Sequence, residues 1–346
     1  MYKTIGEIRS QCAALNKTAA ELDRQKGAIR GFFDKNAHDS VTFIGCGSSF
    51  CVARSAAAAY RKFTGKTANA VCAGDLFLNL SEYKNELKNT ILVSFSRSGS
   101  TSEVVYAVNK ARETCPGLPY LAFNGVPDSP LSKLAQLNVE LPWAVDESVC
   151  QTSSVSNMYF AGITLAGVLS GDDGLIRSMA DMARFGGERM GVFDETAKKC
   201  AQLDWTHAVV LADGVLEGIA EEAALAFKEI CMAPSNYYHL LDFRHGPIVL
   251  INNETLVILA LSPHDTHYQT LLIKDVKKKG ATVLTIGGAD QICPAADFHL
   301  SVPESGDFAA RGLPLLFAAQ LISFHKAVKK NINPDLPVGL DPWIKI

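Results

Sequence analysis

The feature that most constrains the fold is a series of short apolar runs that alternate with helical segments. In the first half of the chain the runs lie at residues 41–44, 91–95, 120–123 and 139–141. Each run is bounded by Gly, Pro, Asn or Ser, which is typical of strands buried on both faces. Helical patterns fall between them, at 49–63 and 102–113. This alternation predicts βαβ units and therefore a parallel sheet covered by helices.

The same order of elements recurs in the second half. Strand-like runs lie at 207–211, 255–261, 282–286 and 300–302, with helical segments at about 216–229 and 270–279. Matching strands begin about 166, 164, 162 and 161 residues after their counterparts. A nearly constant offset indicates a tandem duplication, visible in the pattern rather than in residue identity. We therefore expect an α/β protein of two tandem three-layer αβα sandwiches with parallel sheets.

This pattern also suggests domain limits. A chain of 346 residues is long enough for about two domains. We expect a helical segment at 1–37, a first domain at 38–175, a second domain at 195–330 and a tail at 331–346. The boundary between the domains falls in a helical, Gly-containing stretch at about 170–196.

Charge and hydropathy exclude several partners. The formal net charge of −3 gives no broad attraction for nucleic acid or for an anionic membrane. The first seven residues lack the apolar core of a signal peptide, and the apolar stretch 313–324 is too short to span a bilayer. We expect a cytoplasmic protein with no membrane or nucleic-acid partner.

The nine cysteines carry no metal-ligand pattern. They are scattered, and no Cys-x-x-Cys pair occurs. Most lie in apolar surroundings, which is typical of buried thiols in a reducing compartment. We expect no metal site and no cofactor.

Two Ser- and Gly-rich turns follow predicted strands and precede predicted helices. They read Gly45-Cys46-Gly47-Ser48-Ser49 and Ser96-Arg97-Ser98-Gly99-Ser100-Thr101. Ligands bind at the carboxyl ends of parallel strands, and a helix N-terminus with nearby hydroxyls suits a phosphate. One such turn alone is more often ordinary helix capping, but two in one half favour a phosphate site. Neither turn has the Gly-Lys-Ser/Thr of a P-loop, and Phe50 replaces the third Gly of a dinucleotide motif, which disfavours a nicotinamide-dependent oxidoreductase.

These residues carry a resemblance to a known family. Residues 91–103, ILVSFSRSGSTSE, resemble the signature of the sugar-isomerase (SIS) domain, and 45–49 resemble that family's first loop. The resemblance extends to 128–131, 147–152, 222–229 and 243–247. The chain is similar to the isomerase part of glucosamine-6-phosphate synthase, to amino-sugar-phosphate isomerase/deaminases and to fructosamine-6-phosphate deglycases.

The resemblance implies a set of binding residues. Ser49, Ser96, Ser98 and Thr101 hold the sugar phosphate, while Ser48 and Arg97 line the same loops. Further candidates for substrate contact are Cys46, Gly47, Glu147, Thr152 and Glu222. The corresponding loop of the second half, 262–265, lacks the phosphate pattern, so we expect one functional site per chain.

Two residues are candidates for catalysis. Moving a proton between C1 and C2 of a sugar needs one base that reaches both carbons, and usually an acid/base that opens the ring. Glu229 shares a helix face with Glu222, and His245 lies in a turn broken by Gly and Pro; taken alone, both carboxylates would be assigned to the surface and the histidine to a structural role. The resemblance makes Glu229 the base and His245 the ring-opening residue. In the family this histidine comes from the neighbouring subunit, which implies a homodimer.

Differences from the family pattern reduce the number of reactions that the chain is expected to catalyse. Ala226 stands where the synthase has a helix lysine, and Pro342 stands where it has an imine-forming lysine; Lys345 is nearby. Residue 2 is Tyr and not the nucleophilic cysteine of a glutaminase domain, so we expect no glutaminase domain and no glutamine-dependent amination. We expect an isomerase-type enzyme acting on an amino-sugar or fructosamine 6-phosphate, with deamination or amine release. A deglycase proper and a non-catalytic sugar-phosphate sensor remain alternatives.

Overall fold

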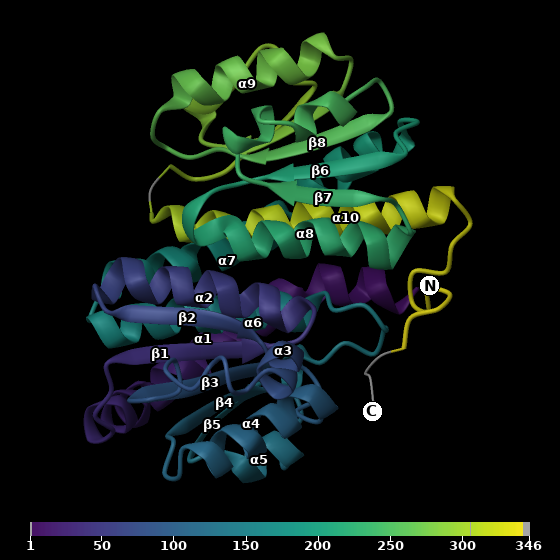
Figure 1. The fold of residues 1–346 in the computed structure, drawn as a ribbon. Helices are drawn as coiled ribbons and strands as arrows, with labels where there is room; N and C mark the ends of the chain where they lie inside the picture. Colours follow the sequence, from purple (N-terminus) through teal and green to yellow (C-terminus); the bar gives the residue numbers. More distant parts are fainter. Residues whose placement is uncertain (1, 305, 342–346) are drawn as a thin grey trace. The chain divides into compact units, whose positions relative to one another are not determined.

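The computed structural model describes residues 2–304 and 306–341 and divides into two units (Figure 1). The N-terminal unit holds residues 10–146 and 151–180 with Asp341. The C-terminal unit holds residues 2–9, 147–150, 181–304 and 306–340. Helices α1 (Lys3–Lys35) and α7 (Asp173–Gln202) contribute to both units.

The N-terminal unit is built on a five-stranded parallel sheet of order β2-β1-β3-β4-β5. Its strands are β1 (Ser40–Gly45), β2 (Thr67–Cys72), β3 (Thr90–Ser96), β4 (Tyr120–Asn124) and β5 (Leu137–Glu140). Every residue of β3 and β4 is buried. Their continuous apolar runs are therefore explained by helices on both faces of the sheet.

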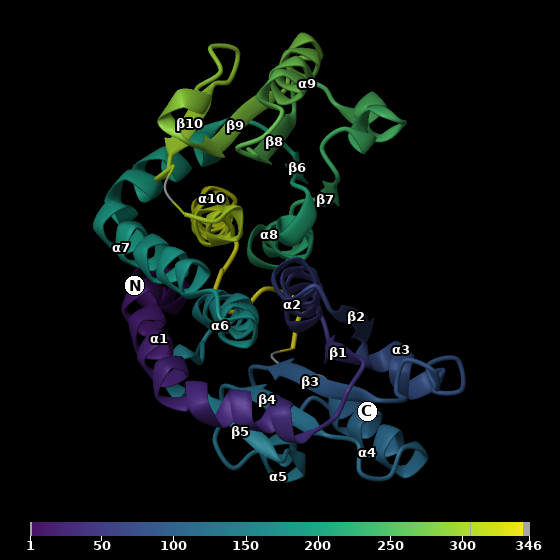
Figure 2. The same cartoon turned by 90° about the vertical axis from the view of Figure 1, so that its left-hand side faces the viewer.

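Helices cover the two faces of this sheet in separate layers (Figure 2). One layer holds α2 (Ser48–Thr64) and α6 (Ser153–Ser170), and the other holds α3 (Ala73–Leu78), α4 (Ser102–Thr114) and α5 (Pro130–Leu134). Phe43, Phe95 and Phe123 stack across three neighbouring strands, with ring centroids 6.2 and 5.1 Å apart. A Cβ on Gly162 of α6 would lie 3.0 Å from Ala56 Cβ of α2 and 3.2 Å from Phe95 Cζ, so a larger residue there would force α6 away from these neighbours.

The C-terminal unit has its own five-stranded parallel sheet, of order β10-β9-β8-β6-β7. The strands are β6 (His207–Leu211), β7 (Ser235–Tyr238), β8 (Thr255–Ala260), β9 (Thr282–Gly287) and β10 (Phe298–Ser301). Helices α8 (Glu217–Cys231) and α10 (Gly312–Lys329) pack together on one face, and α9 (Thr266–Lys278) closes an apolar core on the other. Short 3-10 turns are η1 (Pro142–Ala144), η2 (Gly214–Leu216), η3 (Asp242–Arg244), η4 (Pro247–Leu250), η5 (Ala289–Gln291) and η6 (Phe308–Arg311).

The fold class predicted from the sequence is confirmed. Both sheets are parallel, and the strand orders become the same when β6 is matched to β1. Two strands were missed, β2 and β7, and each lies at one edge of its sheet. Their sequences, TANAVC and SNYY, are only partly buried and lack a continuous apolar run. Because neither run is continuously apolar, hydrophobic pattern alone does not find these two strands.

One ion-paired cluster helps to hold the C-terminal unit together. The Asp194 carboxylate on α7 accepts hydrogen bonds from His325 Nε2 of α10 at 2.6 Å and from Arg9 Nη2 of α1 at 2.7 Å. Burial acts to raise the pKa of Asp194, but His325 and Arg9 outweigh it and leave this pKa below its usual value. The cluster therefore favours the ionised carboxylate.

Candidate functional site

The first Ser/Gly loop joins β1 to α2 by a very tight turn. A Cβ on Gly45 would lie 2.5 Å from the backbone of Ser49, and Gly47 has a φ of +52°. The Ser49 N–H donates to the Cys46 carbonyl at 3.1 Å, and both Ser48 and Ser49 are buried. The two glycines therefore place the first turn of α2 directly at the carboxyl edge of the sheet.

The second loop folds on its own hydroxyl groups. Ser96 Oγ accepts a hydrogen bond from the Gly99 N–H at 2.9 Å, and Ser98 Oγ accepts one from the Ser100 N–H at 3.2 Å. Ser98 Oγ also lies 3.4 Å from Thr101 Oγ1. This spacing lets the Ser98 and Thr101 hydroxyls donate together to one small anion.

Gly99 ties this loop to the connection between β4 and α5. Its φ is +62°, and a Cβ there would lie 2.1 Å from Ser129 Oγ. The Leu131 N–H donates to the Gly99 carbonyl at 3.0 Å. The Arg97 carbonyl also packs tightly against Gly125, since a Cβ on that glycine would lie 2.5 Å from it. Close packing on both sides makes the loop rigid, as a preorganised binding site requires.

Both loops end at helix N-termini, which are electropositive. The N-cap of α2 is Gly47, which has no side chain to satisfy the helix amides. The N-cap of α4 is Thr101, and the first helical hydrogen bond there runs from the Val105 N–H to the Thr101 carbonyl. Amides that precede the first helical bond, together with the helix dipole, favour a bound anion.

A third helix N-terminus is organised by Asp146, which the sequence did not single out. Its carboxylate accepts backbone N–H bonds from Thr152 at 3.1 Å, Ser153 at 2.8 Å and Ser154 at 3.1 Å. It also accepts bonds from the hydroxyls of Thr152, at 2.9 Å, and Ser154. Asp146 lies six residues before Thr152, so no local capping pattern reveals it. It holds Thr152 and the start of α6 in place.

The structure brings the predicted phosphate residues to one edge of the N-terminal sheet. Strands β1 and β3 are direct neighbours, so the loops that follow them lie side by side. Helices α2 and α6 pack together, and their C-terminal ends line one common pocket. The two helices therefore run in the same direction, which places Thr152 at the same end as Ser48 and Ser49.

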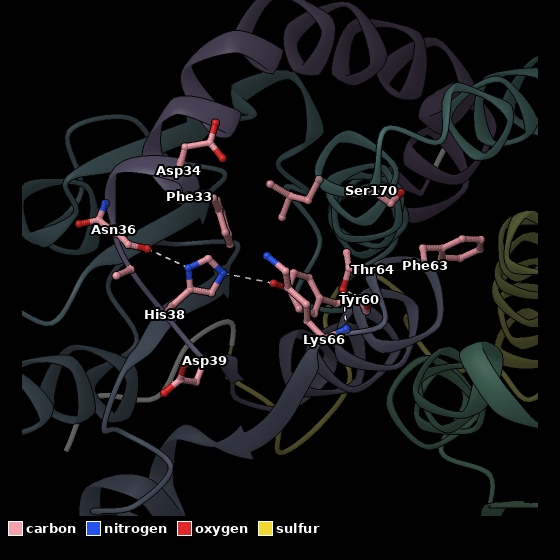
Figure 3. Close-up of a pocket in the computed structure, with 12 residues that line it drawn as sticks. Phe33, Asp34, Asn36, His38, Asp39, Tyr60, Phe63, Thr64, Lys66 and Ser170 are labelled. Carbon is pink, nitrogen blue, oxygen red and sulfur yellow. Dashed lines mark hydrogen bonds between the residues drawn. The ribbon is translucent and has the colours of Figure 1, made fainter.

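That common pocket lies at the opposite end of the unit (Figure 3). It has a volume of about 580 Å³ and is lined by the last turns of α1, α2 and α6 and by residues 36–39, which lead into β1. Figure 3 shows His38 Nε2 facing the Tyr60 hydroxyl, at 3.4 Å. Because it opens at the amino end of β1, the pocket is separate from the phosphate loops and is not the candidate site.

The catalytic candidates lie in the C-terminal unit. On α8 the Glu222 side chain is buried and Glu229 is half-buried. His245 is exposed and follows η3, just before Gly246, whose φ is +136°. Arg244 anchors this turn to α9, because its Nη2 and Nε lie 2.9 and 3.1 Å from Asp275 Oδ2. The exposed imidazole of His245 is therefore carried by a turn that the Arg244–Asp275 ion pair anchors.

The remaining candidate residues lie in both units or outside the described residues. Glu147 belongs to the C-terminal unit and is exposed, with its Oε2 atom 2.8 Å from Lys3 Nζ. Arg97 is buried in the N-terminal unit. Pro342 and Lys345 lie outside the described residues. The roles of all these residues stay predictions.

Within residues 2–304 and 306–341, no group of three or more His, Cys, Asp and Glu side chains is placed to hold a metal ion. None of the helices in the same ranges is both long enough and apolar enough to cross a membrane.

Fold and loops together define a double αβα protein with two Ser- and Gly-rich loops at the carboxyl edge of its N-terminal sheet. Residues 35–166 and 203–329 both match the SIS domain family, and the chain belongs to that family. This confirms the resemblance seen in the sequence.

Relatives and solved structures agree with this assignment. D-galactosamine-6-phosphate deaminase AgaS of Escherichia coli O157:H7 is 27% identical, over 96% of this chain and 90% of its own length. A glutamine–fructose-6-phosphate aminotransferase of Methanothermobacter thermautotrophicus is 23% identical, over 98% of this chain but 57% of its own length. The crystal structure of tagatose-6-phosphate ketose/aldose isomerase from Escherichia coli has a TM-score of 0.87 at 24% identity, covering 99% of this chain and 97% of that one. The last similarity is one of fold.

Proposed function

We propose that the protein is a phosphosugar isomerase-type enzyme that converts an amino-sugar 6-phosphate to a ketose 6-phosphate and releases the amine. The observation that carries this proposal is the paired Ser98 and Thr101 hydroxyls, 3.4 Å apart at the N-terminus of α4. Hydroxyls and helix amides bind a phosphate without bringing fixed positive charge. The adjacent loop supplies Ser48 and Ser49, which lie at the start of α2.

Glu229 and His245 carry the chemistry in this proposal. His245 opens the sugar ring by moving a proton between the ring oxygen and the anomeric hydroxyl. Glu229 then removes the C2 proton of the open aldosamine and returns it to C1. The product of that transfer is a C2 imine, which water hydrolyses to the ketose and ammonia. Support comes from the half-buried position of Glu229 and from the fixed turn that presents His245.

The substrate class follows from the relatives. One relative is named a galactosamine-6-phosphate deaminase and another a fructose-6-phosphate aminotransferase, so both handle six-carbon sugars with phosphate and nitrogen. We therefore propose a hexosamine 6-phosphate as the substrate. A fructosamine 6-phosphate, which a deglycase would cleave, needs the same proton transfer and is the alternative substrate.

We further propose that the enzyme acts as a homodimer. His245 is exposed, and large apolar side chains on the same segment are exposed beside it: Leu241 at 44%, Val249 at 73% and Leu250 at 58%. Several exposed apolar residues on one segment mark an interaction surface. A second copy of the chain that covers this segment would place His245 in its partner's site.

We propose a cytoplasmic location without nucleic-acid partners. The nine cysteines, all within the described residues, form no disulfide, which suits a reducing compartment. The net charge of −3 offers no general attraction for nucleic acid. Cell fractionation that recovered the protein outside the cytoplasm would contradict this.

NMR in D2O tests the enzyme proposal. The protein is mixed in turn with glucosamine 6-phosphate, galactosamine 6-phosphate and fructoselysine 6-phosphate. Deuterium incorporation at C1 or C2, with release of amine, is expected on a hexosamine phosphate. Turnover of the fructosamine phosphate alone would make the protein a deglycase, and binding without exchange on every compound would make it a sensor.

A pair of variants tests the base. Glu229→Gln should abolish exchange while phosphosugar binding persists, because it removes the base and keeps the side-chain shape. Glu221→Gln is the matched control, since it makes the same change on the same helix and should keep turnover. Equal turnover in the two variants would exclude Glu229 as the base.

Subunit complementation tests the shared site. Chains carrying Glu229→Gln and chains carrying His245→Asn should each be inactive alone. When they are co-expressed, half of the dimers are mixed, and each mixed dimer regains one intact site, which restores about a quarter of wild-type activity. No recovery from demonstrably mixed dimers would show that His245 acts within its own chain.

A further inference from the structure

Two cysteines far apart in the sequence meet beside the first phosphate loop. Cys46 follows β1, and Cys72 is the last residue of β2, where it pairs in register with Gly45. This register makes Cys72 a neighbour of the residue that precedes Cys46, and each cysteine shifts the pKa of the other. Both side chains are half-buried, whereas most of the other cysteines are buried. This is a pair of neighbouring thiols that solvent can reach, and the catalytic proposal makes no use of it.

The surroundings make the two thiols chemically different. The hydrogen bond from Cys46 lowers the pKa of Cys72 to about 6, against the effect of burial. Backbone amides of Asp75 and Gly74 also lower it, while the Asp75 carboxylate opposes them. The pKa of Cys46 is raised by its bond to Cys72, by burial and by the nearby Glu103 carboxylate on α4. The lowered pKa makes Cys72 the more nucleophilic sulfur of the pair.

We propose that Cys46 and Cys72 form a reversible disulfide on exposure to a hydroperoxide, and that this bond distorts the first phosphate loop. The part of the proposal that concerns the disulfide rests on the strand register that makes the two half-buried cysteines neighbours. The part that concerns the loop rests on the proposed function of that loop in binding phosphate.

The oxidation balances with one hydroperoxide. The Cys72 thiolate attacks the terminal peroxide oxygen and breaks the O–O bond, giving a sulfenic acid and, for hydrogen peroxide, hydroxide that becomes water. The Cys46 sulfur then attacks the Cys72 sulfur and displaces a second water, with its own proton leaving to the sulfenic oxygen. The two sulfurs lose two electrons in total, and the peroxide gains them.

The position of Cys46 explains why the bond would matter to the loop. Its carbonyl accepts the Ser49 N–H that starts α2, and it lies between Gly45 and Gly47 in the tight turn. A covalent bond from Cys46 to the end of β2 would pull this turn away from the Ser98 hydroxyl. Losing one hydrogen bond to the charged phosphate would weaken binding by about tenfold to a hundredfold.

Peptide mapping of the intact chain tests the disulfide. After hydrogen peroxide treatment, mass spectrometry should show the loss of two hydrogens and a peptide that links Cys46 to Cys72, both reversed by dithiothreitol. Cys72→Ser should abolish the linked peptide. Cys115→Ser, a half-buried cysteine of the same unit, is the control and should leave the link intact. Oxidised protein without this linked peptide would overturn the proposal.

A second measurement does not depend on oxidation. The rate of Cys72 alkylation by iodoacetamide should rise with pH around a midpoint near the pKa of about 6. The groups that affect Cys72 are the Cys46 thiol and Asp75 of α3, and Glu103 of α4 affects Cys46. A midpoint in the ordinary thiol range, about 8.5, would contradict the assignment of Cys72 as the nucleophile.

Calorimetry with glucosamine 6-phosphate separates this proposal from the proposed function. Reduced protein should bind, and oxidised protein should bind about tenfold to a hundredfold more weakly. Equal affinity in both forms would overturn the effect on the loop. A reduced protein that binds no phosphosugar would instead refute the proposed function, and the disulfide would be judged by the peptide map alone.

Discussion

Replacing Asp146 with Ala should destabilise the N-terminal unit and release the start of α6. Asp146 is buried and accepts hydrogen bonds from three consecutive backbone amides, those of Thr152, Ser153 and Ser154. It also accepts the hydroxyls of Thr152 and Ser154. A single carboxylate therefore satisfies most of the helix N-terminus.

The expected loss can be worked from these bonds. Removing an N-cap acceptor costs about 0.5–2 kcal/mol. Each amide left buried without a partner costs a further penalty of about 1–3 kcal/mol. The costs are not additive, because water enters the space left by the carboxylate, so we expect about 3–4 kcal/mol in total. Asp146→Asn keeps one acceptor oxygen and should lose about half as much.

Urea unfolding followed by tryptophan fluorescence measures this loss in the correct unit. Trp143 belongs to the N-terminal unit, where its Nε1 donates to Thr18 Oγ1 at 2.9 Å. With Trp205 and Trp343 changed to Phe, the signal reports that unit alone. A loss below about 1 kcal/mol for Asp146→Ala would refute the claim that this carboxylate supports α6.

Two further predictions concern binding and pH. Ser98→Ala should weaken phosphosugar binding by about tenfold to a hundredfold, the value of one hydrogen bond to a charged group, whereas Ser100→Ala should not; unchanged affinity by calorimetry would remove Ser98 from the phosphate site. Asp194 has a folded-state pKa below its unfolded value, so its stabilisation is full above pH of about 4 and is lost as pH falls through the lower folded value. Asp194→Asn should therefore lower the free energy of unfolding by about 1–2 kcal/mol at pH 7. Below pH 4, the stability of this variant should fall less steeply than that of the wild type, which is the control in the same urea titrations. Parallel acid profiles for the two proteins would contradict the ion-pair assignment.

Local pattern was sufficient for most of the fold. The strand predicted at 207–211 coincides with β6, and the one at 91–95 lies within β3, because buried parallel strands are continuous apolar runs. Strands β2 and β7 could not be found this way, since their residues are only partly buried at the sheet edges. The resemblance to the SIS family, carried by the two Ser/Gly loops, was confirmed by the match to both halves.

The site was predictable only in part. Ser96, Ser98 and Thr101 follow a strand and start a helix, so their place at the carboxyl edge follows from the chain order of a parallel sheet. Asp146 could not be recognised, because its partners are fixed by the path of a loop rather than by a capping motif. The roles of Glu229 and His245 stay predictions, as a helix position and an exposed turn do not by themselves specify chemistry.

The sequence by itself determined the two αβα sandwiches with their parallel sheets. It also determined the two loops at the carboxyl edge of the N-terminal sheet, because hydrophobic periodicity and Gly/Ser turns are signals that extend over only a few residues. Only the tertiary structure decided that Cys46 meets Cys72 and that Asp146 holds the start of α6. The physical reason is that these contacts depend on strand register and loop path. Pairing β1 with β2 in parallel brings together residues separated by a whole helix, and no local pattern records which side chains then face each other.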